Sequence, residues 1–449
     1  MKNDRLFNLV SLGCPKNRVD SERILSVMTQ AGFVYTDDPA AARVIIINTC
    51  AFIEPAVEES IDTILDYRDN REAFLVVAGC MPLRYRESLE EPLPEVDLFL
   101  TPDKILDLPN LLKETLNQAA ESGSSHLPTS AEFLVTQAKV SSSRHCRVLT
   151  TAGYAYLKIA EGCSRLCRYC TIPSIRGPLR SADPYELEQE AIFLASVGVR
   201  ELVLVAQDLT SYGVERGEKG GLIRLLERLR RVEDIKWIRL MYLYPDSVPR
   251  GLGRLINESE NILPYLDIPF QHVSAEVLRA MGRPWKGDRI RKLTERLRNE
   301  IPGLVLRTTF MVGYPAEGDK EFSELRDFVQ SFDIDHVGVF TYSPEEGTPA
   351  KALGDPVSAD VKQARADEIR VIHSRLTEKR NRQRIDRVEQ GIVEGVSEES
   401  ELLLQGRLWN QAPEVDGILY VTAGEATAGE IHNIRITNSN GPDFFGEIA

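Results

Sequence analysis

Three cysteines stand close together on one short, polar stretch of the chain. Cys163, Cys167 and Cys170 have the spacing Cys-x3-Cys-x2-Cys, with the aromatic residue Tyr169 directly before the last of them. Three thiolates so close in sequence can hold three irons of a four-iron, four-sulfur cube and leave the fourth iron open to a small molecule. The spacing therefore predicts a reactive [4Fe-4S] cluster rather than a closed structural one.

Zinc and simple burial are the alternatives for this triplet. A structural zinc site needs four ligands, and no further Cys or His follows Cys170 within twenty residues. His145 and Cys146 precede the triplet, but not at zinc-finger spacing. Three merely buried cysteines are not expected on so polar a loop. The cluster remains the favoured interpretation.

Three further cysteines follow predicted strands near the N-terminus. Apolar runs alternate with amphipathic helical stretches, which predicts a parallel sheet with helices on its faces. These segments occupy residues 6–12, 20–31, 44–48, 54–67 and 74–78. Cys14, Cys50 and Cys80 each lie near the end of one strand, at the edge where ligands bind in open parallel sheets. Burial explains any one of them, but three in the same position favour a second cluster.

The middle of the chain repeats the alternation of strands and helices. Six predicted strands lie at residues 155–159, 202–205, 237–242, 265–268, 304–311 and 337–342. Such a series predicts a partial (β/α) barrel of parallel strands. The loop with Cys163 follows the first of these strands, and barrel chemistry takes place at the carboxyl ends of strands. The predicted fold and the predicted cluster therefore agree.

The last segment is predicted to be a small antiparallel β-barrel. A charged helical stretch at 359–384 precedes short alternating strands at 391–396, 401–405 and 417–421. The stretch 121–150 is rich in small polar residues, which predicts a linker, and Cys146 within it is interpreted as a spare thiol. The predicted α/β multidomain organisation is a cluster domain at 1–120, the linker at 121–150, the partial barrel at 151–380 and the small barrel at 381–449.

Composition predicts a cytoplasmic protein without a membrane span. The 449 residues are 43% hydrophobic, with no apolar run of membrane length and no signal peptide at the start. Seven cysteines are too few for a disulfide framework in so long a chain. The net charge is −14, and residues 384–449 hold four basic and twelve acidic side chains, a balance of −8. This favours a basic protein partner over nucleic acid, although a solvated acidic face is the alternative.

The triplet at 163–170 resembles the motif of radical S-adenosylmethionine enzymes. With Cys14, Cys50, Cys80 and the terminal small barrel, the chain resembles their methylthiotransferase branch, which has a cluster domain, a radical barrel and a TRAM domain. Three runs are most similar to the ribosomal-protein methylthiotransferases of that branch, namely SLGCPKN at 11–17, YLDIPFQH at 265–272 and QAPEVDG at 411–417. The resemblance covers essentially the whole chain.

This resemblance implies insertion of a methylthio group at the β-carbon of one aspartate in small-subunit ribosomal protein twelve, free or in the ribosome. It implies two 4Fe-4S clusters and S-adenosylmethionine as cofactors, an electron donor and a sulfur source as partners, and nucleic acid only through the ribosome. The cluster on Cys163, Cys167 and Cys170 would bind S-adenosylmethionine and start the radical reaction. The cluster on the N-terminal cysteines would carry the sulfur. No catalytic residue beyond the cluster ligands is implied.

Further contacts with the cofactor are expected from residues near the barrel mouth. They are Tyr169, Gln207, Arg307, Val312 and Gly313. A simple strand-to-helix turn is the alternative at Gly313, and a structural charge is the alternative for Arg307. His272 is expected near the mouth as a structurally satisfied histidine. Two other functions remain open, a transfer-RNA adenosine methylthiotransferase and a non-catalytic iron-sulfur carrier.

Overall fold

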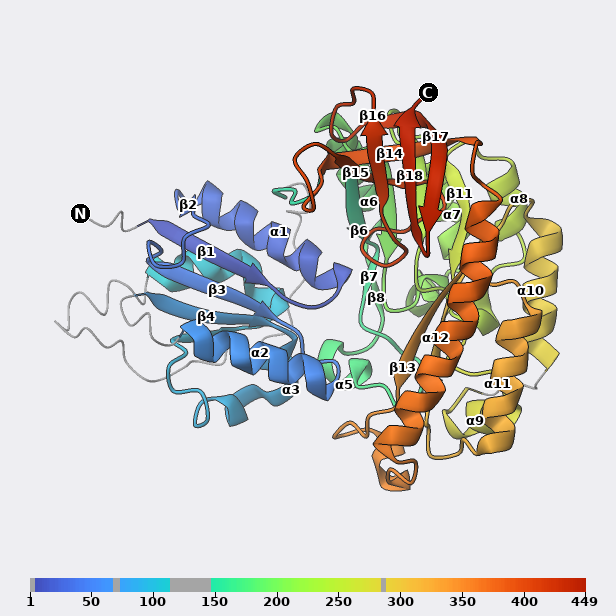
Figure 1. The fold of residues 1–449 in the computed structure, drawn as a ribbon. Coiled ribbons are helices and arrows are strands. Elements are labelled where there is room, and N and C mark those ends of the chain that lie inside the picture. The colour runs from blue at the N-terminus through green and yellow to red at the C-terminus, as the bar shows by residue number, and fades with distance from the viewer. Residues whose placement is uncertain (1–4, 68–72, 114–146, 284–287) are drawn as a thin grey trace. The chain divides into compact units, whose positions relative to one another are not determined.

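A computed structural model describes residues 5–67, 73–113, 147–283 and 288–449 of the chain (Figure 1). It divides into two compact units. The first unit contains Met1–Thr150 and Thr171–Pro178, and the second contains Thr151–Cys170 and Leu179–Ala449. Most of the predicted linker at 121–150 lies outside the described residues. Cys146 also lies outside them. The short segment after Cys170 thus groups with the first unit, although the sequence-based division assigned it to the barrel.

The first unit contains a five-stranded parallel sheet with strand order β2-β1-β3-β4-β5. The strands are β1 (Leu6–Ser11), β2 (Val34–Tyr35), β3 (Val44–Thr49), β4 (Phe74–Gly79) and β5 (Leu98–Leu100). Every residue of β3 and β4 is buried, as expected for central strands covered on both faces. The predicted parallel sheet is confirmed, while the two short edge strands β2 and β5 were not predicted.

Helices cover both faces of this sheet (Figure 1). They are α1 (Pro15–Gln30), α2 (Glu54–Tyr67), α3 (Cys80–Tyr85) and α5 (Ile172–Arg176), with 3-10 turns η1 (Arg86–Leu89) and η2 (Pro102–Asp107). Ile46 and Val76 pack with α1 on one face, whereas Ile45, Ile47 and Val77 pack with α2 on the other. This alternation follows the two-residue period of a strand.

The second unit contains a six-stranded parallel sheet with strand order β13-β12-β11-β10-β9-β6. The strands are β6 (Tyr154–Lys158), β9 (Glu201–Val205), β10 (Trp237–Leu240), β11 (Ile262–Asp267), β12 (Val305–Val312) and β13 (His336–Thr341). All six predicted strands are confirmed, with ends that shift by up to three residues. The edges β6 and β13 do not pair with each other, so the barrel is partial.

Helices and short turns connect these strands. They are α6 (Pro184–Ser196), α7 (Gly221–Leu229), α8 (Leu252–Asn257), α9 (Ala275–Ala280), α10 (Asp288–Glu300), α11 (Asp319–Ser331) and α12 (Ala359–Arg382), with η3 (Leu209–Ser211), η4 (Val214–Arg216), η5 (Pro245–Ser247) and η6 (Pro349–Leu353). A two-stranded ribbon of β7 (Ala160–Glu161) and β8 (Arg180–Ser181) brings together the two chain segments that flank the loop of Cys163.

The terminal segment folds into a closed barrel with strand order β14-β15-β16-β18-β17. Its strands are β14 (Val388–Val396), β15 (Leu404–Leu408), β16 (Leu419–Ala423), β17 (Ile431–Asn440) and β18 (Asp443–Ile448). The barrel is confirmed, except that β16 and β18 run parallel rather than antiparallel. The predicted strand at 401–405 begins only at Leu404, because Leu402 lies in a turn with its side chain 92% exposed.

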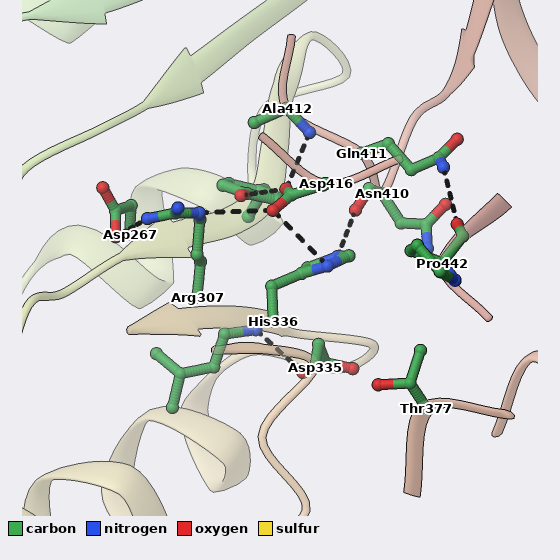
Figure 2. Close-up of polar contacts among 12 residues, drawn as sticks. Asp267, Arg307, Asp335, His336, Thr377, Asn410, Gln411, Ala412, Asp416 and Pro442 are labelled. Atoms are coloured by element: carbon green, nitrogen blue, oxygen red, sulfur yellow. Dashed lines mark hydrogen bonds and ion pairs between the residues drawn. The ribbon is translucent and has the colours of Figure 1, made fainter. Parts of the chain in front are cut away.

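Charged side chains join this terminal barrel to strands β11, β12 and β13 (Figure 2). Arg307 pairs with Asp416 of the terminal barrel at 3.2 Å and with Asp267 of β11 at 3.3 Å. Asp416 also accepts a hydrogen bond from the hydroxyl of Tyr265 and lies 3.4 Å from Nδ1 of His336. Burial would raise the pKa of Asp416, but His336 and Arg307 outweigh it and hold the pKa below its ordinary value.

A second buried ion cluster lies beside the first. Glu201, at the start of β9, pairs with Arg239 at 2.6 Å and with Arg407 of the terminal barrel at 2.7 Å. Arg407 also pairs with Glu394 at 2.6 Å. Buried charges of this kind are stable only when each is paired, so the two clusters fix the terminal barrel to the parallel sheet within the second unit.

Candidate active site

The register of the first sheet brings the loops of the N-terminal cysteines together. Thr49 of β3 pairs with Gly79 of β4, so Cys50 and Cys80 directly follow paired residues on strands about 4.8 Å apart. Cys14 precedes α1, after a tight turn at Gly13. Gly13 has a φ of +87°, and a Cβ on it would lie 2.7 Å from Cβ of Cys50. The loop can pass this close to Cys50 only with glycine at that position.

Burial and the two neighbouring thiols shift the pKa of Cys50. Burial raises the pKa of Cys50 to about 11, although the backbone N–H of Phe52 opposes the shift. The neighbouring Cys80 and Cys14 raise it further. Three converging thiols suit an iron-sulfur cluster, for which thiolate is the usual ligand. Among the described residues, no three Cys, His, Asp or Glu side chains are arranged so that they could hold a metal ion.

Asn17 holds two of these loops in place. Its Nδ2 donates to the carbonyl of Thr49 at 2.8 Å and to that of Leu12 at 3.2 Å, and these residues precede Cys50 and Cys14. The backbone carbonyl of Asn17 accepts from Nδ2 of Asn48 at 2.8 Å. Asn17 is fully buried, so these bonds are shielded from water.

The cysteine loop of the second unit, residues 162–170, is held on one side by Arg165. Its Nε lies 2.7 Å from Oδ2 of Asp208, which follows β9, and its Nη2 lies 2.7 Å from Oγ of Ser247. The guanidinium also stacks over Tyr244, with 4.0 Å to the ring centroid. The backbone N–H of Arg165 donates to Sγ of Cys163 at 3.4 Å. The ends of β9 and β10 thereby fix the shape of the loop.

The other side of the loop rests on the segment after α9. The N–H of Arg168 donates to the carbonyl of Met281 at 3.0 Å. Gly282 has a φ of +73°, and a Cβ there would lie 2.6 Å from the carbonyl oxygen of Leu166. The next residue, Arg283, is buried and interacts with Cys167. The cysteine loop is therefore supported from two directions, as a site that must hold a cofactor requires.

Family models match three parts of the chain in the predicted order. Residues 6–101 match the model described as Uncharacterized protein family UPF0004, residues 157–329 match the Radical SAM superfamily, and residues 386–449 match the TRAM domain. The two cysteine triplets lie in the first and second of these matches. The prediction of a radical S-adenosylmethionine domain and a TRAM domain is confirmed.

Curated relatives match the chain over nearly its whole length. A protein of Trichlorobacter lovleyi named ribosomal protein uS12 methylthiotransferase RimO is 44% identical, with 98% of this chain and 97% of the relative covered. The chain belongs to the RimO family. Proteins of the same name from Geobacter sulfurreducens and Aquifex aeolicus are 43% and 42% identical over 98% of this chain.

A solved structure with a related fold is the radical S-adenosylmethionine methyltransferase TsrM of Kitasatospora setae. It is 16% identical, covers 77% of each chain and has a TM-score of 0.53. At this identity the likeness concerns the fold alone. Within the described part of this RimO-family chain, no helix is long and apolar enough to cross a membrane.

The other predicted cofactor contacts of this RimO-family chain lie in different surroundings. Tyr169 interacts with Cys167 and Arg283, and burial raises its pKa above the ordinary value. Gln207 directly precedes Asp208, the partner of Arg165, so it lies next to the cysteine loop. Both positions agree with the predicted contacts, which stay predictions.

Val312 and Gly313 lie at the carboxyl end of β12, as predicted. Gly313 has a φ of +75°, and the side chain of Lys362 from α12 covers the place where a Cβ would stand. This close packing is a structural reason for the glycine, besides the predicted approach to a cofactor. Arg307 lies near the opposite end of β12, where its guanidinium forms ion pairs with Asp267 and Asp416. Its surroundings are those of a structural charge, and its contact with the cofactor stays a prediction.

His272 is structurally satisfied, as expected. Its Nε2 lies 3.1 Å from Oε2 of Glu317, and its Nδ1 accepts from the N–H of Ser274 at 2.9 Å. The other oxygen of Glu317 accepts from the N–H of Gly313 at 2.8 Å and pairs with Arg365 at 2.7 Å. His272 thus supports the turn after β12.

Sequence reasoning missed the residues that support the two triplets. Arg165 lies between two motif cysteines, so its place in the motif was the available signal, but its partner Asp208 is 43 residues away. Tyr242 and Gln271 adopt a positive φ, of 62° and 69°, just after β10 and β11. Non-glycine residues with a positive φ are uncommon and gather at functional sites. The residue type does not indicate such a conformation in a sequence.

Proposed function

We propose that this protein inserts a methylthio group at the β-carbon of an aspartate in ribosomal protein uS12, in the cytoplasm. The observation that carries this proposal is the 44% identity to a protein named ribosomal protein uS12 methylthiotransferase RimO across 98% of the chain. The converging N-terminal thiols and the supported cysteine loop are consistent with it. Each brings three cysteines to loops that follow strands of a parallel sheet.

In this proposal the cysteines hold two 4Fe-4S clusters with separate tasks. When bound, the clusters and S-adenosylmethionine supply radical chemistry and a transferable sulfur, which no ordinary side chain can provide. Cys163, Cys167 and Cys170 hold the cluster that binds S-adenosylmethionine, and Arg165 and Arg283 fix their loop. Cys14, Cys50 and Cys80 hold the second cluster. An electron donor and a sulfur source complete the reaction.

Exposed charge on the terminal barrel supports a protein substrate over transfer RNA. Several of its acidic side chains are exposed, namely Glu398, Glu399, Glu401, Glu425, Glu430 and Glu447. Its buried arginine, Arg407, is paired with Glu201 and Glu394. Such a surface repels phosphate and attracts a basic ribosomal protein, and it meets nucleic acid only through the ribosome.

A competition experiment tests the choice of substrate. The reconstituted enzyme receives reductant, S-adenosylmethionine labelled in its methyl group, and equal amounts of uS12 and transfer RNA. We expect label in uS12, which should disappear when its target aspartate is changed to alanine. Label in transfer RNA with none in uS12 would contradict the proposal and favour the transfer-RNA enzyme.

A carrier function is tested by the fate of S-adenosylmethionine. We expect the reduced protein to form 5′-deoxyadenosine repeatedly, and a Cys163→Ala variant to form none. A Cys146→Ala variant is the matched control, because it removes one thiol outside both triplets. A loaded protein that gives up iron to an acceptor but never forms 5′-deoxyadenosine would support the carrier instead.

A further inference from the structure

Arg176 places a buried cation against one of the N-terminal cysteines. Its Nη2 lies 3.1 Å from Sγ of Cys80 and 2.6 Å from Oδ1 of Asn17. Arg176 is only 4% exposed and Cys80 only 6%. Burying a guanidinium is costly unless its hydrogen bonds are satisfied. The contact with the sulfur is therefore part of a defined arrangement and not a chance approach of a mobile side chain.

The partners of Arg176 fix the direction of its guanidinium. Nη1 lies 3.1 Å from Oδ2 of Asp20, whose side chain is 3% exposed. Asn17, the partner of Nη2, is the residue that holds the loops of Cys14 and Cys50. One network of buried hydrogen bonds thus begins at two cysteine loops and ends on the sulfur of the third cysteine.

The segment that carries Arg176 is built into the first unit. Residues Thr171–Pro178 group with that unit, although they directly follow Cys170, the last cysteine of the second triplet. Ile175 is 4% exposed and belongs to the apolar core on the α2 face of the sheet. Oγ1 of Thr171 donates to the carbonyl of Phe52 at 3.0 Å. This packing holds Arg176 in place independently of its contact with Cys80.

We propose that Arg176 is a positioning residue for the cluster on Cys14, Cys50 and Cys80, in which it donates a hydrogen bond to the sulfur of Cys80 and raises the reduction potential of that cluster. Hydrogen bonds to ligand sulfurs help to set iron-sulfur potentials, because they stabilise the more negative reduced state. The inference rests on the second cluster of the proposed function. Arg176 follows Cys170 closely in sequence, but in this proposal it acts on the cluster of the N-terminal cysteines.

The test uses the full chain with Cys163, Cys167 and Cys170 changed to alanine, so that any remaining cluster belongs to the N-terminal triplet. Its reduction potential is measured by redox titration with electron paramagnetic resonance, before and after Arg176→Gln. At a fixed potential we expect the ratio of reduced to oxidised cluster to fall roughly three- to tenfold in Arg176→Gln. A tenfold change corresponds to about 59 mV for a one-electron couple. Arg176→Lys keeps the charge and a donor, so its potential should lie in between.

Arg84→Gln is the matched control. Arg84 also lies in the first unit beside a cysteine loop, but its Nη1 donates to the carbonyl of Ala51 at 2.8 Å rather than to a sulfur. Its removal deletes the same charge, and we expect an unchanged potential. Equal shifts in the Arg84 and Arg176 variants would show a general effect of charge and would overturn the role of the hydrogen bond.

The remaining outcomes separate this inference from the proposed function. A parent protein that binds no cluster would contradict the second cluster itself. A loaded Arg176→Gln variant with the parent's potential would overturn only the inference. If Arg176→Gln takes up no iron, the reduction potential of Arg176→Lys is compared with that of the parent. A lower potential in Arg176→Lys supports the inference, and an equal potential overturns it. Failure of both folded variants to bind iron would show a role in assembly alone and would also overturn the effect on potential.

Discussion

Oδ2 of Asp208 lies 2.7 Å from Nε of Arg165, so the segment after β9 is joined to the loop that carries Cys163, Cys167 and Cys170. Asp208 is 3% exposed, and its other oxygen accepts from the N–H of Thr210 at 2.9 Å. The carboxylate therefore shapes its own turn and the cysteine loop together. A charge-assisted bond of this length is among the stronger kinds in proteins.

Asp208→Asn should slow radical initiation without removing iron. Asparagine keeps the acceptor for Thr210 but loses the charge that fixes Arg165, so the loop shifts slightly. Small displacements of a reacting group can cost up to about a hundredfold in rate, and we expect a fall of roughly tenfold or more in 5′-deoxyadenosine formed per cluster. Asp183→Asn, at the exposed N-cap of α6, is the control and should leave the rate unchanged. An unaltered rate in Asp208→Asn would show that this ion pair does not position the loop.

The two cysteine triplets should be separable by mutation. Changing Cys163, Cys167 and Cys170 to alanine should abolish cleavage of S-adenosylmethionine, while iron and the spectrum of the N-terminal cluster remain. Changing Cys14, Cys50 and Cys80 should stop sulfur insertion and spare cleavage, because those thiols lie on the other sheet. Iron content, spectra and 5′-deoxyadenosine are the measurements. Loss of all iron from either triple variant, in a folded chain, would argue against two independent sites.

Asp416→Asn should weaken the attachment of the terminal barrel. The change leaves Arg307 buried with Asp267 as its remaining partner in this cluster, and breaking a buried pair costs about 3 kcal/mol or more. We expect a loss of that order in the free energy of unfolding, measured by urea denaturation, with faster proteolysis near residue 384. Asp246→Asn removes an exposed pair with Arg289 and should change stability by less than about 1 kcal/mol. Equal losses in the two variants would refute a special role for Asp416.

His373 should make the second unit less stable in acid. Burial lowers its pKa from 6.5 to about 4, with the charges of Arg380 and His336 acting in the same direction. Because the folded pKa lies below the unfolded one, its contribution is complete above about pH 6.5 and is lost as the pH falls from there toward 4. The thermal midpoint of the metal-free protein should fall over this range, and less steeply in His373→Gln. Parallel curves for the two proteins would contradict this assignment.

The sheets were predictable from the sequence because their strands are short apolar runs between amphipathic stretches. The run at 44–48 is wholly buried in β3, and its neighbours follow the same rule. Strand β2 has only two residues, both exposed, so it carries no such signal. The parallel pairing of β16 and β18 also lies beyond local pattern, since it depends on how the barrel closes.

The two cysteine triplets could be proposed from the sequence because residue type and spacing are local signals. The residues that support their loops depend on distant partners. Arg176 and Cys80 are 96 residues apart, and nothing in either neighbourhood indicates the contact. For Arg307 the sequence leaves a cofactor contact and a structural charge open, and its partner Asp416 lies 109 residues away. Tertiary ion pairs of this kind decide whether a charge serves a site or the fold, and one sequence does not reveal them.

Intact-mass analysis of uS12 tests the central claim most directly. The reconstituted enzyme is incubated with uS12, free or in ribosomal subunits, together with reductant, a sulfur source and S-adenosylmethionine. We expect uS12 to gain the mass of one methylthio group less one hydrogen, on a single aspartate, and to gain nothing with the variant lacking Cys14, Cys50 and Cys80. An unchanged mass of uS12, under conditions in which the same enzyme forms 5′-deoxyadenosine, would contradict the account.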